Sequence, residues 1–104
     1  MSATQQQYGT SEDLVRILTY NNVPSTVSDI IVTELHAFEN LHDFVYCEER
    51  EFETLRTRYF EEKPAEDVVK RWPTVATSRL IYVHRWLVQY IAKYGVFPDP
   101  RELT

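Results

Sequence analysis

Apolar residues recur at steps of three and four along most of this chain, which is the spacing of a helix face rather than of a strand. The first stripe consists of Leu14, Ile17 and Leu18. Thr10 and Ser11 precede it, and the side chains of such residues cap helix N-termini by accepting backbone N–H groups. The pattern therefore predicts a first helix near residues 11–21, ended by Asn21-Asn22.

Three more stripes follow after the extended turn at Val23-Pro24. They are Val27, Ile30, Ile31 and Leu35; then Leu41, Phe44 and Val45; then Phe52, Leu55 and Tyr59. We expect Ser25 to cap the second helix and Asn40 to cap the third, with Phe38 filling the turn between them. The segment Ile30–Thr33 could instead form a short strand, but the Glu34-Leu35-His36 continuation favours a helix. The fourth helix is predicted from Glu48 to Tyr59.

The last helix has the clearest signal. Residues 74–94 contain neither Gly nor Pro, and 21 residues at about 1.5 Å each give about 31 Å, the width of a small domain. Its core stripe is predicted to be Ala76, Leu80, Val83, His84, Leu87, Ile91 and Tyr94. Gly95 stands where a left-handed C-cap belongs, and Val96 is expected to pack back on the helix.

These elements predict a compact all-α bundle of about five helices. Residues 1–9 are expected to form a disordered tail, and residues 10–104 a single helical domain. A short amphipathic piece around Val68 and Val69 is expected to end near Trp72-Pro73, after the interruption at Pro64.

Composition supports one globular domain, since 43% of the 104 residues are hydrophobic and 26% are charged. No run of 18 apolar residues exists, so no membrane-spanning segment is predicted. The N-terminal residues lack the basic and apolar regions of a secretion signal, and we expect an intracellular location, cytoplasmic or nuclear.

Charge is unevenly distributed along the chain. Residues 1–67 carry 5 basic and 14 acidic side chains, whereas residues 68–104 carry 6 basic and 2 acidic ones. The acidic and basic parts can neutralise each other within one molecule, which we favour, or attract each other between molecules.

The sequence offers little support for catalysis. His36 and Glu39 have metal-compatible spacing only if a helix continues through Phe38, and a metal site needs more ligands. Cys47 has no accompanying catalytic motif, and free cysteines are usually small buried apolar groups. His84 lies on a core stripe, where a hydrogen-bonded structural histidine is expected.

Other catalytic and cofactor signatures are missing as well. The abundant carboxylates form a dense run, which is typical of a solvated face rather than of an acid–base pair in a cleft. The two glycines do not form a phosphate-binding loop. We therefore predict that the protein is not an enzyme and takes no metal, cofactor or small-molecule substrate.

Residues 11–59 resemble a sterile alpha motif (SAM) or SAM-like helical domain. The resemblance lies in the opening "SEDLVRIL", the turn "NNVP", a second helix, and the passage "FENLHDFVYCEEREFETL". In the last passage Glu48, Glu49, Phe52 and Leu55 match an acidic turn that opens a further helix in that family. The chain lacks the family's early aromatic residue in the first helix and its Gly after the acidic passage, and it has an insertion around Pro64 and Trp72.

A second resemblance is to the N-terminal helical region of Copia-type retroelement polyproteins. It involves "ILTYNNVPSTVSDIIVTEL" and "RWLVQYIAKYGVFPDPRELT". This resemblance implies a structural protein of a virus or mobile element.

One flank of the last helix has an unusual composition. Tyr82, Trp86 and Tyr90 recur every four residues beside the core stripe, and Arg79 and Lys93 share their side of the helix. Tyr, Trp and Arg are the residue types enriched at interface hot spots. We call these five residues the aromatic flank; it is either a partner-binding surface or additional core.

The sequence as a whole predicts a protein–protein interaction or assembly module that acts by self-association or by docking to a larger complex. In the SAM-like version, an acidic surface at Glu48, Glu49 and Glu51 meets a basic helix end on the next molecule, a contact that can propagate. The alternative is a nucleic-acid-associated structural protein. Its candidate cations are Lys70, Arg71, Arg79, Arg85 and Lys93, although the net charge of −5 disfavours it.

Overall fold

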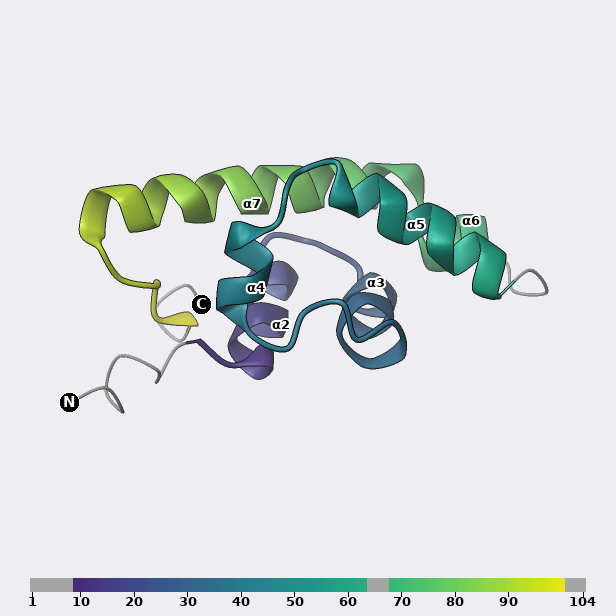
Figure 1. The fold of residues 1–104 in the computed structure, drawn as a ribbon, viewed down its shortest axis with the longest axis horizontal. Coiled ribbons are helices and arrows are strands. Elements are labelled where there is room, and N and C mark those ends of the chain that lie inside the picture. Colours follow the sequence, from purple (N-terminus) through teal and green to yellow (C-terminus); the bar gives the residue numbers. More distant parts are fainter. Residues whose placement is uncertain (1–8, 64–67, 101–104) are drawn as a thin grey trace.

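The computed structural model describes residues 9–63 and 68–100. Its elements are α2 (Ser11–Tyr20), α3 (Ser25–Asp29), the π-helix η1 (Ile30–Glu34), α4 (Leu41–Tyr46), α5 (Glu51–Glu62), α6 (Val68–Arg71) and α7 (Thr74–Tyr94) (Figure 1). The described ranges contain an isolated bridge between Thr10 and Asn40 but no named strand, which confirms the all-α class. Residues 1–8 of the predicted tail and the interruption at Pro64 lie outside the described residues.

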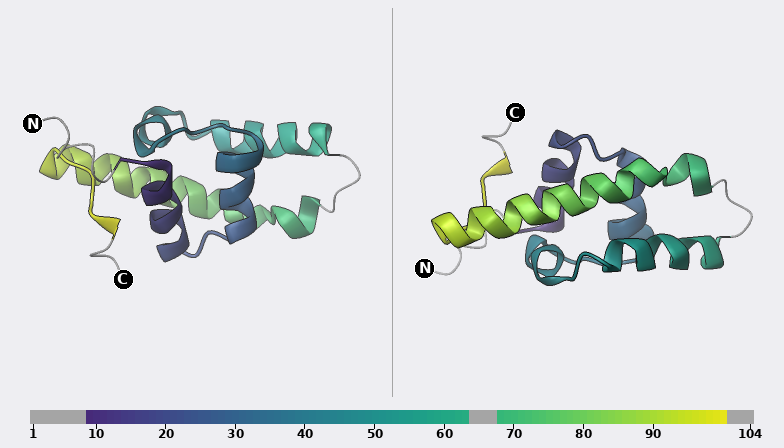
Figure 2. Two further views of the ribbon diagram at one scale, coloured as in Figure 1. Left: turned by 90° about the horizontal axis from the view of Figure 1, so that it is seen from below. Right: turned by 90° about the horizontal axis from the view of Figure 1, so that it is seen from above.

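The helices are arranged around the long helix α7. Helices α2 and α3 cross beneath it, whereas α5 runs alongside it (Figure 2). The C-terminal end of α7 extends beyond the helices underneath, and the molecule measures 46 × 25 × 22 Å (Figure 1). Helix α7 is therefore in contact with the others along one side of its length.

The predicted first helix is confirmed almost residue for residue. The Thr10 hydroxyl accepts the Asp13 N–H at 3.2 Å, and the Asp13 carboxylate accepts the Thr10 N–H at 3.1 Å, so both N-terminal donors are satisfied. At the other end, the Asn21 side-chain amide donates to the Ile17 carbonyl at 2.8 Å. Asn22 then takes a positive φ of 65°, which turns the chain towards α3.

The second helix differs from expectation at its start. The predicted Ser25 cap is wrong, because Pro24 occupies the N-cap position and Ser25 is already the first helical residue. Pro is suited to this site, since it has no N–H and its φ is restricted. The strand alternative at Ile30–Thr33 is also wrong: α3 continues directly into η1, where the Leu35 N–H donates to the Ile30 carbonyl at 2.7 Å. The predicted stripe and Phe38 are buried.

The third helix begins as predicted, whereas the fourth begins three residues late. The Asn40 side chain accepts the Asp43 N–H at 2.9 Å and caps α4. Residues 47–50 form a turn, because the extended backbone at Cys47 ends α4 and redirects the chain before α5 starts at Glu51. The predicted start at Glu48 is therefore wrong.

Helix α7 has the predicted bounds, and Gly95 ends it with a left-handed φ of 74°. Two details of the prediction are wrong. Tyr94 is 56% exposed rather than core, because α7 has passed the helices beneath it by this point (Figure 1). Val96 is also exposed, and the partly buried Phe97 packs against the core instead.

The core is continuous from α2 to α7. Its largest fully buried side chains are Trp72, Tyr59, Phe44 and Phe52. The Trp72 indole donates to the Thr77 hydroxyl at 3.1 Å, and the Arg56 Nε donates to the Trp72 carbonyl at 3.0 Å, so this large residue joins α5 to the start of α7. Among the described residues, no helix combines the length and apolar character needed to cross a bilayer.

Candidate interaction surface

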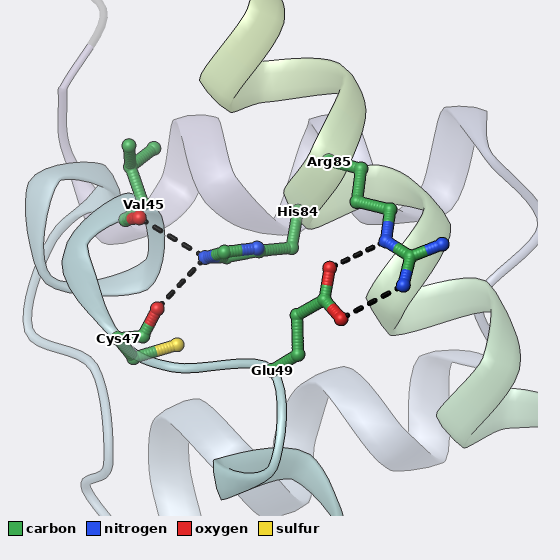
Figure 3. Close-up of polar contacts among 5 residues, drawn as sticks. All are labelled: Val45, Cys47, Glu49, His84 and Arg85. Carbon is green, nitrogen blue, oxygen red and sulfur yellow. Dashed lines mark hydrogen bonds and ion pairs between the residues drawn. The ribbon is translucent and has the colours of Figure 1, made fainter.

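His84 anchors the inner side of α7 to the end of α4. Its imidazole is 8% exposed, and Nε2 lies 3.0 Å from the Val45 carbonyl oxygen and 2.9 Å from that of Cys47 (Figure 3). Both partners are acceptors, so Nε2 carries the proton and donates to them. The rings of Phe44 and Phe52 pack edge-on against the imidazole. The expected hydrogen-bonded core histidine is therefore confirmed.

Arg85 fastens the same helix to the turn before α5. Its Nε and Nη2 donate to the two carboxylate oxygens of Glu49 at 2.5 and 2.9 Å (Figure 3). These hydrogen bonds from Arg85 hold the pKa of Glu49 below its usual value, and they raise that of the guanidinium. A second pair joins α6 to η1, where Arg71 donates to Glu34 at 3.1 Å. In these two ion pairs, acidic residues from the first part of the chain neutralise basic residues from the second part within one molecule.

The predicted acidic site lies on the turn and at the start of α5. Glu49 is engaged by Arg85, and Glu48 pairs with Arg50 at 2.6 Å on the open surface. Glu51 is exposed at the first position of α5. The three glutamates are therefore neighbours, but the carboxylate of Glu49 already has a partner inside the molecule.

The aromatic flank divides into exposed and partly buried members. Tyr82 is 64% exposed, whereas Trp86 and Tyr90 are partly buried. Trp86 also packs against the core. The Trp86 and Tyr90 rings lie 5.7 Å apart between centroids. The flank is thus a ridge at the edge of the core, with its outer part open to solvent.

Two further residues extend this surface, and sequence reasoning did not include them. The Tyr94 ring lies 4.6 Å from that of Tyr90, and the Lys93 ammonium lies 5.2 Å from the Tyr94 ring centroid. Val75 is 51% exposed and stands two helical turns before Tyr82. The seven-residue spacing between Val75 and Tyr82 places both on one side of the helix, so the sequence could have predicted Val75 as part of this surface. Tyr94 could not be found in this way, because its position falls on the predicted core stripe.

The two cations of the flank, Arg79 and Lys93, differ from the paired arginines of the inner side. Arg79 donates to the backbone carbonyl of Asn22 at 2.7 Å, which holds the α2–α3 loop against α7. Neither Arg79 nor Lys93 pairs with a carboxylate in the described part of the chain. Helix α7 itself contains no Asp or Glu. The outer surface of α7 therefore combines aromatic side chains with positive charge.

Cys47 and the possible metal ligands are the groups that the sequence offered for catalysis. Cys47 is half-buried, and burial raises the pKa of its thiol to about 11, which suppresses the nucleophilic thiolate. Within the described ranges, no three His, Cys, Asp or Glu side chains gather as a metal site would require. An open hollow of about 630 Å³ lies beside the N-terminus of α2, where the Thr10–Asp13 cap already satisfies helix donors.

Neither a scan against models of protein families nor searches of curated proteins and solved structures finds a match to this chain. The resemblances to SAM-like domains and to Copia-type polyproteins therefore stay predictions.

Proposed function

We propose that this protein is a non-catalytic interaction module that acts by self-association or by docking to a larger complex. Its binding surface would be the aromatic flank with Val75 on the outer side of α7, continued by Tyr94 where the helix extends beyond the core. The observation that carries this proposal is the exposure of Tyr82 and Tyr94 on a helix whose inner side already packs against a complete core. Exposed apolar and aromatic groups gathered on one surface commonly mark an interaction site.

The support beneath this surface favours tight binding. His84 and Arg85 attach α7 to the α4–α5 connection, and Arg79 attaches it to the α2–α3 loop. The backbone of such a fixed helix loses little further freedom when a partner binds, so less of the binding free energy is spent on ordering the backbone. In Figure 2, viewed from above, no described element covers α7.

Association with nucleic acid is the second candidate. Aromatic rings interleaved with cations can stack on the bases of a single strand. Fewer cations are available than the sequence suggested, however, because Arg71 pairs with Glu34 and Arg85 with Glu49. With few phosphates neutralised and a net charge of −5, binding to nucleic acid would be weak.

Chromatography with light scattering at low and high salt tests self-association. The variant Tyr82→Ser/Tyr94→Ser removes the two exposed rings, and Tyr46→Ser is its control because Tyr46 is 69% exposed on α4. Self-association through the flank predicts an oligomer that the double variant dissociates and the control leaves intact. An oligomer that persists in the double variant would place the contact elsewhere.

If the wild-type protein is monomeric, docking to a different protein is tested instead. The full chain is used as bait for a displayed library of helical peptides, and enrichment by the wild type is compared with enrichment by the double variant. Peptides that are enriched by the wild type but not by the double variant support the proposal. Equal enrichment by both proteins contradicts it. Trp86→Ala is less informative, because Trp86 packs against the core and its loss would also lower stability.

A further inference from the structure

We propose that the partner on the outer side of α7 is an acidic amphipathic helix from a different protein. This inference rests on the proposed function and specifies the chemistry of the partner. The partner helix would present an apolar stripe to the aromatic rings and carboxylates to Arg79 and Lys93.

The charges on α7 favour an acidic partner. The helix carries cations but no carboxylate, and Arg79 and Lys93 contact no carboxylate among the described residues. The Arg79 guanidinium uses Nη1 to hold the Asn22 carbonyl, and that neutral acceptor leaves its charge uncompensated. Complementary charges at the rim of an interface guide association and fix the register of the partner.

The spacing along α7 specifies the partner further. Arg79 and Lys93 are 14 positions apart, or about 21 Å along the axis, and lie close to the same side of the helix. Tyr82, Trp86 and Tyr90 lie between them. A helix lying along this surface would place apolar residues at steps of three and four against the rings, with acidic residues about four turns apart at the two ends.

A second copy of the chain fits this surface poorly. Antiparallel pairing of two α7 helices about Trp86 would bring Arg79 of one copy to Lys93 of the other, and like charges in an interface are unfavourable. Helix α5 carries four glutamates, but Arg58 stands among them. Its exposed Phe60 also lies beneath the Arg56 guanidinium, 5.0 Å from the ring centroid. If α5 of a second copy lay along α7, its arginines would therefore approach the cations of α7, and like charges repel.

The experiment uses the full chain and a displayed library of helical peptides, with Leu and Ala on one face and Glu, Lys or Gln free at the positions beside it. We expect the peptides that need Tyr82 and Tyr94 to carry Glu at positions about four turns apart. Enrichment of Lys, or no charge preference, among peptides that still need these rings would overturn the acidic partner and leave the interaction surface intact. Enrichment independent of the rings would contradict the proposed function itself.

Fluorescence anisotropy with an enriched peptide then tests the two cations. Arg79→Gln/Lys93→Glu should weaken binding by about three- to tenfold, as loss of rim ion pairs does. The matched control Arg16→Gln/Arg50→Glu, with the same charge change on α2 and the α4–α5 turn, should leave affinity within about twofold. Equal weakening in both variants would overturn the inference.

Two measurements on the unaltered protein keep the test independent of variant folding. Affinity for the enriched peptide should fall as salt concentration rises, and a salt-independent affinity would contradict the ionic contacts. A single-stranded oligonucleotide that binds more tightly than the peptide and competes with it would assign the surface to nucleic acid instead.

Discussion

At the scale of single residues, burial separates side chains that share one helix. Leu87 and Val88 are neighbours on α7, yet Leu87 is fully buried and Val88 is 41% exposed. In the same way Tyr82 faces solvent, whereas Trp86, one turn later, packs against the core. The expected effect of a substitution therefore depends on which side of α7 the residue occupies.

Leu87→Ala should lower the free energy of unfolding by about 2–5 kcal/mol, because it removes buried methyl groups and leaves a cavity. Val88→Ala, the control on the exposed side, should have a much smaller effect. Urea melts followed by circular dichroism measure both. Equal midpoints for wild type and Leu87→Ala would show that the core stripe of α7 has been misplaced.

Cys47 should react slowly with iodoacetamide at about pH 8 in the folded protein and faster in urea, because burial keeps the thiol protonated. The raised pKa has a consequence for stability. The folded state holds the thiol proton more tightly than the unfolded state does. The contribution of the protonated Cys47 thiol to the free energy of unfolding is therefore fully present below pH 9.0 and is lost as pH rises towards about 11. Cys47→Ser should not show this loss of stability at alkaline pH. Identical urea melts of wild type and Cys47→Ser between about pH 9 and 11 would contradict the raised pKa of Cys47.

At the scale of elements, local capping chemistry sets most of the helix ends. Thr10 and Asn40 accept the backbone N–H groups of the residues three positions later, and Gly95 closes α7 in the left-handed conformation. Each device is built from residues that lie within one turn of the helix end. The start of α5 is different, because the turn at Cys47 decides it.

Gly95→Ala should lower the free energy of unfolding by about 1 kcal/mol, since φ is 74° and a side chain is disfavoured there. Apart from Gly95 itself and its neighbours in the chain, no described atom lies within 4 Å of the added Cβ, so the cost arises from the backbone conformation rather than from a clash. Gly95→Asn should cost less, because Asn tolerates this conformation. Thermal melts of the three proteins give the ranking, and an Asn variant less stable than the Ala variant would refute the argument.

At the scale of the whole molecule, ion pairs join the acidic part of the chain to the basic part. Glu49 and Arg85 join the α4–α5 turn to α7, and Glu34 and Arg71 join η1 to α6. Among the residues that the structure describes, Arg79 and Lys93 on the aromatic flank of α7 pair with no carboxylate. The same fold that satisfies the inner charges thus leaves positive charge on the outer surface.

The Glu49–Arg85 pair should contribute a pH-dependent part of the stability. Its contribution is present above the ordinary carboxyl pKa of 4.5, because Glu49 has a lowered pKa in the folded state, and it is lost as pH falls below that value. Arg85→Gln should therefore shift the urea midpoint more at about pH 7 than at about pH 3. Lys93→Gln is the control, since Lys93 has no carboxylate partner among the described residues, and a similar pH dependence in both variants would exclude the pair as its cause.

The sequence by itself determined the helical class, the bounds of α7 and the inward stripes of the shorter helices. These features follow from side-chain periodicity and from capping residues close in the chain, and both act locally. The family resemblances and the interaction function stay predictions, since neither follows from local rules.

Only the tertiary structure decided which side of α7 is covered and which charges are already paired. Glu49 and Arg85 are 36 residues apart, and only packing of α5 beside α7 brings them together. Trp86 packs against the core, whereas Tyr94 is exposed because α7 extends beyond the helices beneath it. A periodic stripe alone could not predict either result. Exposure depends on where neighbouring helices stop, and that is a property of the assembled fold rather than of any one segment.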